Sequence, residues 1–197
     1  MKKTAIFLVC MIGLALPSHA LLSFGIKGGA NYSTLNGGQA IGQNLGGFTV
    51  GTYLRLPLSP LFSIQPEILY TQKGAKGTFT LAGSGIISQR VVLEYIEIPV
   101  LFKYKIFPFF AIYGGPYVGL STSSKATNTT SNTTTDISQS IENSDWGAVI
   151  GGSFQIFRLV LDLRYSLGLT NITTLGSDPN YRHGTMTIMA SYNFPVL

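Results

Sequence analysis

The stretch of sequence that decides the fold is VVLEYIEIPVLFKYK, residues 91–105. One alternating set of its side chains is apolar or aromatic, with Glu94 as the exception. The other set is mixed and includes the charged residues Glu97, Lys103 and Lys105. Side chains of a strand point alternately to its two faces, so one face of this strand suits an apolar medium and the other a polar, enclosed space.

The same alternation recurs along the chain and predicts eight strands. We expect them at residues 23–34, 47–58, 61–73, 91–105, 109–121, 145–156, 159–170 and 184–194. The connections alternate between long and short, and aromatic residues fall near the strand ends. An even strand number, short periplasmic turns, longer outer loops and aromatic girdles are typical of bacterial outer-membrane barrels. The sequence therefore predicts an all-β fold, an eight-stranded antiparallel up-and-down transmembrane β-barrel.

The first twenty residues have the features of a secretory signal peptide. Lys2 and Lys3 precede an apolar run at residues 5–16, and small residues stand before Ala20. Such a run is too short to span a bilayer as a helix. We expect cleavage after Ala20, a barrel domain at residues 21–197, and export to the outer membrane.

Composition argues against several other classes of protein. Cys10 is the only cysteine, so no disulfide is expected after cleavage. Loss of Lys2 and Lys3 leaves 11 basic and 8 acidic residues, a net charge of +3 that is too small and scattered for nucleic-acid binding. His183 would be the one remaining histidine, and it has no ligand set or positioned serine beside it. We expect no catalytic, cofactor or metal site.

The inward-facing charges are the candidate functional residues. An eight-stranded barrel is just wide enough for side chains to fill, and a charge enclosed there must be paired. We expect a structural network in the lumen formed by Arg55, Glu67, Glu97, Lys103, Asp162 and Arg164. Further inward charges are expected at Lys27, Lys73, Lys105 and Asp145. Within the network, Glu67 and Glu97 are expected to share Arg164 or Lys103 as partners; an ion or solute path is the alternative.

Three local features carry their own expectations. Pro66 and Pro99 each remove a donor from the ladder of a closed barrel, so we expect a bulge near each of them. Residues 74–89 form either a loop or a continuation of the strands above the membrane. Residues 122–144 are rich in Ser, Thr and Asn, and this composition predicts a mobile loop.

Several stretches together resemble the outer-membrane β-barrel domain family that includes the PorT-like proteins. They read GIKGGANYS, QPEILYTQKGA, YIEIPVLFKY, GPYVG, LRYSLGLTNI and SYNF, and they cover nearly the whole chain after residue 20. The resemblance implies an eight-stranded outer-membrane barrel. Most members have no assigned activity, and the PorT-like members are associated with a protein secretion system. Expected partners are outer-membrane lipid, the barrel assembly machinery and secretion-system proteins.

The sequence leaves several functions open. The first is a structural or interaction role through the outer loops, and the second is an accessory role in secretion. A narrow channel and a lipid-modifying barrel enzyme are further alternatives. A soluble, lipocalin-like barrel is the structural rival, and it would place its apolar side chains inside.

Overall fold

The protein consists of antiparallel strands. The computed structural model describes residues 22–36, 43–81, 85–128, 133–136, 144–169 and 182–195. The strands in these residues are β1 Ser23–Asn36, β2 Gln43–Pro57, β3 Phe62–Leu81, β4 Gly85–Phe107, β5 Phe110–Asn128, β6 Thr133–Asp136, β7 Ser144–Ile156, β8 Leu159–Gly168 and β9 Arg182–Pro195. No helix among the described residues is long and apolar enough to cross a membrane.

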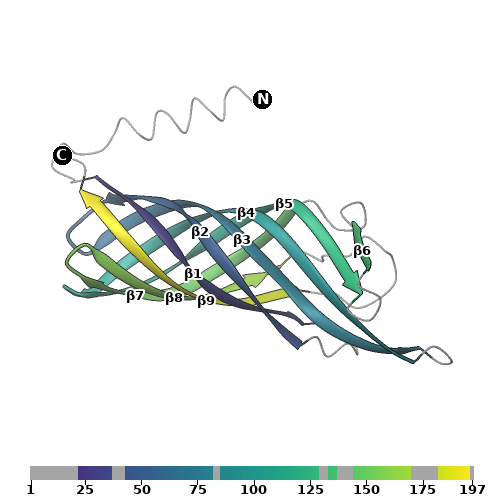
Figure 1. Cartoon of the computed structure of the whole chain (residues 1–197). Helices are drawn as coiled ribbons and strands as arrows, with labels where there is room; N and C mark the ends of the chain where they lie inside the picture. Colours follow the sequence, from purple (N-terminus) through teal and green to yellow (C-terminus); the bar gives the residue numbers. More distant parts are fainter. Residues whose placement is uncertain are drawn as a thin grey trace, which may run out of the picture.

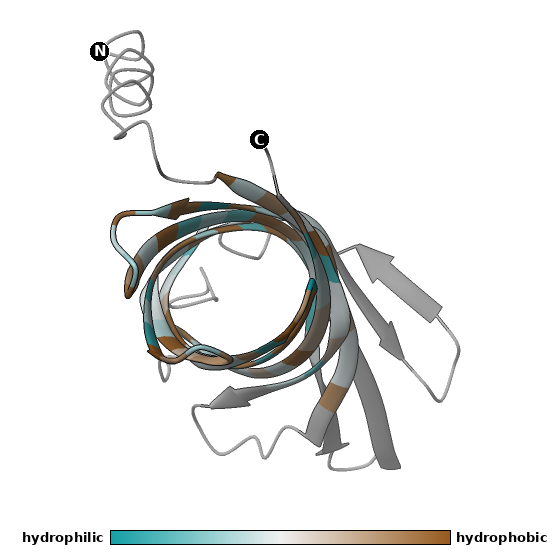
Figure 2. Cartoon of the chain, turned by 90° about the vertical axis from the view of Figure 1, so that its left-hand side faces the viewer, coloured by the Kyte–Doolittle hydropathy of each residue, from teal (hydrophilic) through white to brown (hydrophobic). Residues whose placement is uncertain are grey.

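Eight of these strands close into a barrel. The sheet order is β4-β3-β2-β1-β9-β8-β7-β5, and an additional β4–β5 pairing joins its two ends. The ninth strand, β6, adds to the edge of β5 beyond the barrel. Figure 1 shows the inclined strands, and Figure 2 shows the closed ring viewed end-on. Closure removes the free edges that an open sheet would expose, and it confirms the fold predicted from the alternating pattern.

The short connections gather at one end of the barrel, which we call the turn end. They are residues 58–61, 108–109 and 157–158. Phe157, the first residue of the two-residue turn between β7 and β8, has a φ of 54°, which is the positive-φ conformation that two-residue hairpin turns favour. The opposite end, called the loop end, carries the connections between β1 and β2, β3 and β4, β5 and β7, and β8 and β9.

Strands at the loop end are longer than their apolar patterns predict. β3 and β4 stay paired up to Leu81 and Gly85, so most of residues 74–89 continues the strands, and this hairpin projects furthest in Figure 1. The expected mobile loop at residues 122–144 is wrong in part. Its first residues extend β5, and β6 lies within it. Threonine favours strands, and the existing ladder carries the pairing onward; residues 129–132 and 137–143 lie outside the described residues.

The bulges expected at the two strand prolines are absent from the described ladders. β2 and β3 keep one register on both sides of Pro66, and β4 and β5 do so on both sides of Pro99. Register shifts in these ladders lie elsewhere, one of them between Glu94 and Tyr95. The side-chain alternation therefore continues past Pro99, and Lys103 remains buried inside. Near each proline a few residues of the ladder are unpaired. These gaps accommodate the missing donor, and neither strand has an extra residue.

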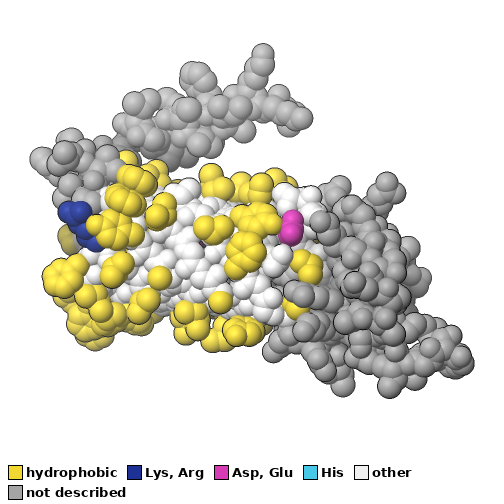
Figure 3. All heavy atoms as spheres, in the orientation of Figure 1, with side chains coloured by type: hydrophobic (Ala, Val, Ile, Leu, Met, Phe, Trp, Pro, Cys, Tyr) yellow, Lys and Arg dark blue, Asp and Glu magenta, His cyan; other side chains and the backbone are white. Residues whose placement is uncertain are grey.

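Apolar side chains cover the outside of the barrel. Phe48 is 47% exposed, Ile98 41% and Leu163 48%, whereas Glu67 and Arg164 are almost fully buried inside. Figure 3 shows hydrophobic side chains spread over the outer surface. A soluble lipocalin-like barrel would have the reverse arrangement, so that rival is wrong. Apolar side chains outside and charged side chains inside are the arrangement expected of a barrel surrounded by lipid.

Inward glycines make room for inward tyrosines. A Cβ on Gly25 would overlap the ring of Tyr53, and a Cβ on Gly147 would overlap the ring of Tyr117. Each tyrosine thus crosses a glycine on a paired strand and fills the narrow lumen. This packing positions the phenol groups among the charged side chains.

Candidate functional site

The interior of the barrel holds most of the charged side chains that the structure describes. Among the described residues, eight charged side chains are at most 6% exposed. They are Lys27, Glu67, Lys73, Glu97, Lys103, Asp145, Asp162 and Arg164. Arg55 is half-buried, and Lys105 lies exposed at the turn end. An enclosed charge costs several kcal/mol unless it is paired, so their partners determine what the lumen can do.

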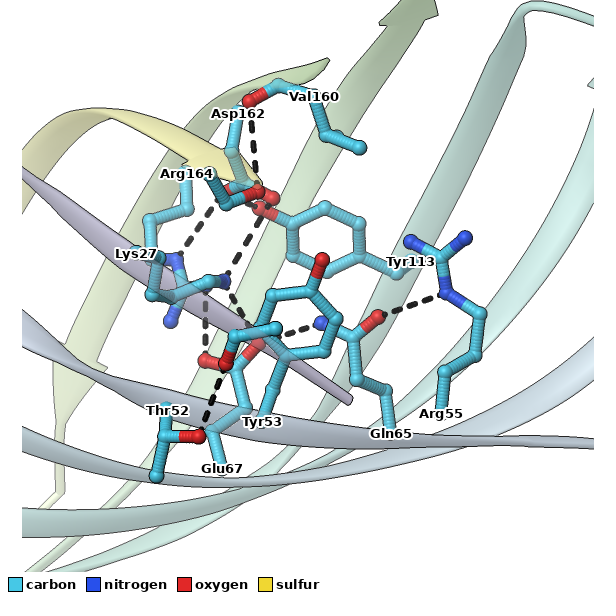
Figure 4. A network of polar contacts seen from close by, with 12 residues as sticks. Lys27, Thr52, Tyr53, Arg55, Gln65, Glu67, Tyr113, Val160, Asp162 and Arg164 are labelled. Carbon is cyan, nitrogen blue, oxygen red and sulfur yellow. Dashed lines mark hydrogen bonds and ion pairs between the residues drawn. The ribbon is translucent and has the colours of Figure 1, made fainter. Parts of the chain in front are cut away.

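A central network joins four residues from three strands: Lys27 on β1, Glu67 on β3, and Asp162 and Arg164 on β8. Lys27 Nζ donates to Glu67 Oε1 at 2.8 Å, and Arg164 Nη2 donates to Glu67 Oε2 at 2.9 Å. Arg164 Nε also donates to Asp162 Oδ1 at 3.3 Å. Lys27 Nζ lies 3.9 Å from Asp162 Oδ2. Figure 4 shows these side chains converging.

Neutral groups complete the central network. Gln65 Nε2 donates to Glu67 Oε1 at 2.6 Å, and the Tyr113 hydroxyl donates to Asp162. Two cations therefore face two carboxylates, and both carboxylates accept additional hydrogen bonds. This is the arrangement in which buried charges offset each other's loss of hydration.

A second group, the loop-end cluster, consists of Lys73, Glu97 and Asp145. Lys73 pairs with Glu97, and its Nζ lies 3.9 Å from Asp145 Oδ2. The Tyr117 hydroxyl donates to Asp145 Oδ2 at 2.8 Å, and the Lys73 ammonium lies 5.1 Å from the centre of the Tyr117 ring. One cation thus serves two carboxylates, and the cluster has a formal charge of −1.

A third group, the turn-end cluster, consists of Arg55, Lys103 and Lys105. Arg55 donates from Nε to Gln65 Oε1 at 3.3 Å and from Nη1 to Gln155 Oε1 at 3.1 Å. Lys103 Nζ lies 5.0 Å from the centre of the Tyr113 ring. Within the described residues, no carboxylate forms an ion pair with any of the three cations.

The six residues expected to form one network fall into different groups. Glu67, Asp162 and Arg164 meet, and the expected pair of Glu67 with Arg164 is present. The partners expected for Glu97 are wrong, because its ion pair is with Lys73. Among the residues that the structure describes, Lys103 has no carboxylate partner, and Arg55 is linked to the central network through Gln65. The structural role of the network stays a prediction.

Sequence reasoning places Lys27 and Lys73 inside the barrel but does not identify them as partners. Lys27 lies on β1 and reaches Glu67 on β3, across the intervening β2. Such a contact depends on how far the strands of a barrel are staggered and tilted. Alternation along one strand shows which face a residue occupies, but it does not give this stagger.

The described residues offer no metal centre. No group of three or more histidine, cysteine, aspartate or glutamate side chains could hold a metal ion there. The side chain of His183 lies outside the described residues, so the expectation that it forms no catalytic or metal site stays a prediction. The geometry described shows an interior that holds charged side chains in fixed positions.

Solved structures show the same fold in other bacterial proteins. The attachment invasion locus protein Ail of Yersinia pestis is 17% identical, with 88% of this chain and 99% of that chain covered, at a TM-score of 0.52. The Neisserial surface protein NspA is 15% identical, with coverages of 87% and 97%, at a TM-score of 0.57. A search of curated proteins gave no match.

A family model describes most of the chain. The model of the outer membrane protein beta-barrel domain matches residues 17–174, which include seven of the eight barrel strands. The match agrees with the closed barrel, its exposed apolar belt and its enclosed charges. This chain belongs to the outer membrane protein beta-barrel domain family.

Proposed function

We propose that this protein is a small outer-membrane barrel with a structural or interaction role, carried out through its outer loops, and that its lumen does not conduct. The observation that supports the closed lumen is the central network, whose four buried charges are held by each other and by Gln65 and Tyr113. An ion crossing the barrel would have to separate these pairs, each of which lies in a poorly hydrated space.

The long strands at the loop end support the interaction role. β3 and β4 extend to Leu81 and Gly85, and β6 adds to β5 at the same end. Paired strands at this end present their backbone to other molecules at a fixed place. The partners proposed on the outer side are therefore surface molecules or proteins, and outer-membrane lipid surrounds the belt.

Conductance across planar bilayers tests the closed lumen. The purified barrel should give no discrete channels at salt concentrations where porins conduct. The matched variant Glu67→Gln weakens the hold on Lys27 and Arg164, and it should open measurable conductance or reduce stability. Steady channels from the unmodified protein would contradict the proposal.

Crosslinking tests the interaction role. Because Cys10 is the sole cysteine and lies in the expected signal peptide, a cysteine placed at Thr78 in the β3 extension would carry a single label. We expect specific crosslinked products from Thr78 and none from a cysteine at the turn residue Ser59 on the opposite side. Equal yields of crosslinked products from both positions would argue against an outer interaction surface.

A role as a PorT-like accessory factor in secretion is the second candidate. It is favoured by the resemblance in QPEILYTQKGA and YIEIPVLFKY, which form parts of β3 and β4. A deletion strain assayed for secreted proteins would separate the two candidate functions, because only an accessory factor should be required for secretion.

We further propose that the chain lacks enzymatic activity, that residues 1–20 are removed on export, and that the barrel assembly machinery inserts it.

A further inference from the structure

A small cavity opens inside the barrel at the turn end. Its volume is about 90 Å³, and its polar wall includes the inward-facing residues Arg55, Lys103, Ser153 and Gln155. Lys105 stands at its entrance, and turn residues between β2 and β3 and between β4 and β5 form its apolar rim. The cavity is separate from the central network and from the loop-end cluster described above.

The charges of this cavity are not balanced by the protein. All three charged residues that line it are cations, and no Asp or Glu among the described residues does so. Figure 3 shows that the Lys and Arg side chains visible on this face also gather at the left-hand end of the barrel, which is the turn end. A narrow, low-dielectric mouth lined by one sign of charge concentrates counter-ions.

Lys103 is the residue of the cavity that most clearly indicates a bound anion. Its side chain is 5% exposed, and its ammonium lies against the Tyr113 ring rather than a carboxylate. Asp162, which lies in the neighbouring central network, is already bound by Arg164 and Tyr113. A buried ammonium without an anion is unfavourable, and an anion entering from solution would remove that cost.

Arg55 is positioned to share such an anion. Gln65 and Gln155 hold two of its nitrogens, Nε and Nη1, and so fix the guanidinium plane. Its Nη2 makes no hydrogen bond to any of the residues that the structure describes. A guanidinium held in one orientation beside a lysine provides a planar donor and a point charge, the pair of groups that recognise phosphate.

We propose that this cavity binds a small, doubly charged oxyanion of the inorganic phosphate class, which enters from the aqueous compartment at the turn end. Lys103 and Arg55 contact the oxyanion directly, and Lys105 at the entrance raises its local concentration. Because the cavity lies on the inner side of the strands, it faces water rather than the lipid belt, and a dissolved oxyanion fits it better than a lipid headgroup.

Calorimetric titration of the full-length barrel with inorganic phosphate tests the proposal. The titration is made in nonionic detergent at constant ionic strength, with chloride replacing phosphate in the blank. The unmodified protein should bind phosphate saturably, and Lys103→Met should weaken binding by at least about tenfold because it removes a buried, directly contacting charge. Absence of saturable binding, or equal binding by Lys103→Met, would overturn the site.

Arg158→Gln is the matched control. Arg158 is an exposed cation at the same end of the barrel, but it does not line the cavity. Its removal should change phosphate affinity by no more than about twofold. An equal loss in Arg158→Gln and Lys103→Met would show only a general positive potential and would overturn a specific site. Lys103→Gln repeats the test, and circular dichroism checks that each variant is folded.

The source of the oxyanion is tested in lipid discs. Phosphate affinity should be the same in discs of phosphatidylcholine with and without added phosphatidylglycerol. A marked loss of phosphate affinity in the anionic discs would show that a lipid headgroup occupies the cavity, and it would overturn the assignment to a dissolved oxyanion.

Discussion

The two ends of the lumen bury charge in opposite ways. At the loop end, Lys73 lies between Glu97 and Asp145, so one cation serves two carboxylates. At the turn end, Arg55 and Lys103 lie near a cavity that no carboxylate of the described residues lines. Between them the central network is balanced. The charges that the structure describes therefore polarise the lumen along its axis, negative at the loop-end cluster and positive at the turn-end cluster.

This difference shows where each end obtains its compensating charge. The loop-end cluster takes its counter-charge from within the protein, since Lys73 faces both carboxylates and Tyr117 and Thr71 add hydrogen bonds to them. Asp145 Oδ1 has no hydrogen-bond partner among the described residues. The turn-end cluster is satisfied by amides, an aromatic ring and, in our proposal, an anion from solution. Charge-removing substitutions at the two ends should consequently have opposite effects on stability.

The largest expected effect is that of Lys73→Met. Removal of this cation leaves Glu97 and Asp145 buried together without a counter-charge, and breaking a buried pair in this way costs about 3–5 kcal/mol. Urea unfolding of the barrel in lipid vesicles, followed by far-ultraviolet circular dichroism, measures the change in the free energy of unfolding.

The matched control for this variant is Lys105→Met. Lys105 is exposed at the turn end, and its removal should change the free energy of unfolding by no more than about 0.5 kcal/mol. If Lys73→Met were equally mild, the loop-end cluster would not depend on its ion pairs, and the contrast between the two ends would disappear.

The glycine substitutions are expected to have the next largest effect. A Cβ at Gly147 meets both the Leu167 carbonyl oxygen and the Tyr117 ring, whereas at Gly25 the nearest atoms all belong to the Tyr53 ring. A side chain can move aside more easily than a paired backbone. We expect Gly147→Ala to cost about 3 kcal/mol and Gly25→Ala about 1 kcal/mol in the same unfolding assay.

Gly28→Ala provides the baseline for both glycine variants. The nearest atoms to a Cβ there are 3.7 Å and 4.0 Å away, which is ordinary contact. Its stability should stay within about 0.5 kcal/mol of the parent protein. Equal losses at Gly25 and Gly147 would show that the tyrosine rings, and not the ladder, determine the cost.

The smallest expected effect is a gain in stability from Lys103→Met. Methionine fills nearly the same space as lysine and removes a buried charge that no carboxylate of the described residues pairs, so unfolding in phosphate-free buffer should become harder by about 1 kcal/mol. Added phosphate should stabilise the parent protein and leave this variant unchanged. A loss of stability like that of Lys73→Met would mean that both ends rely on internal partners.

The fold could be predicted from the sequence because alternation is a local property. Glu97 and Ile98 point to opposite sides of β4 as their positions require, and the same rule holds past Pro99. The ends of β3 and β4 at the loop end could not be predicted, since the apolar alternation of the sequence fades after residue 73. There, ladder pairing between β3 and β4 continues without an apolar pattern to reveal it.

The partners within the lumen could be predicted only in part. Glu67 and Arg164 are both near mid-strand, and their pairing was foreseeable from depth alone. The pairing of Glu97 with Lys73 depends on the stagger between β3 and β4, which brings Leu69 opposite Glu97 and Leu93 opposite Lys73. A cavity at the turn end depends on how two turns and the inner faces of several strands come together, and no single stretch of sequence encodes it.

The fluorescence of Trp146 tests the central claim most directly, because it is the sole tryptophan of the chain. Trp146 is 58% exposed on the outer face of β7, while its neighbour Asp145 is buried inside. In vesicles, brominated acyl chains should quench this fluorescence and aqueous iodide should not. Quenching by iodide together with insensitivity to brominated lipid would contradict a barrel with apolar side chains in lipid and charges enclosed.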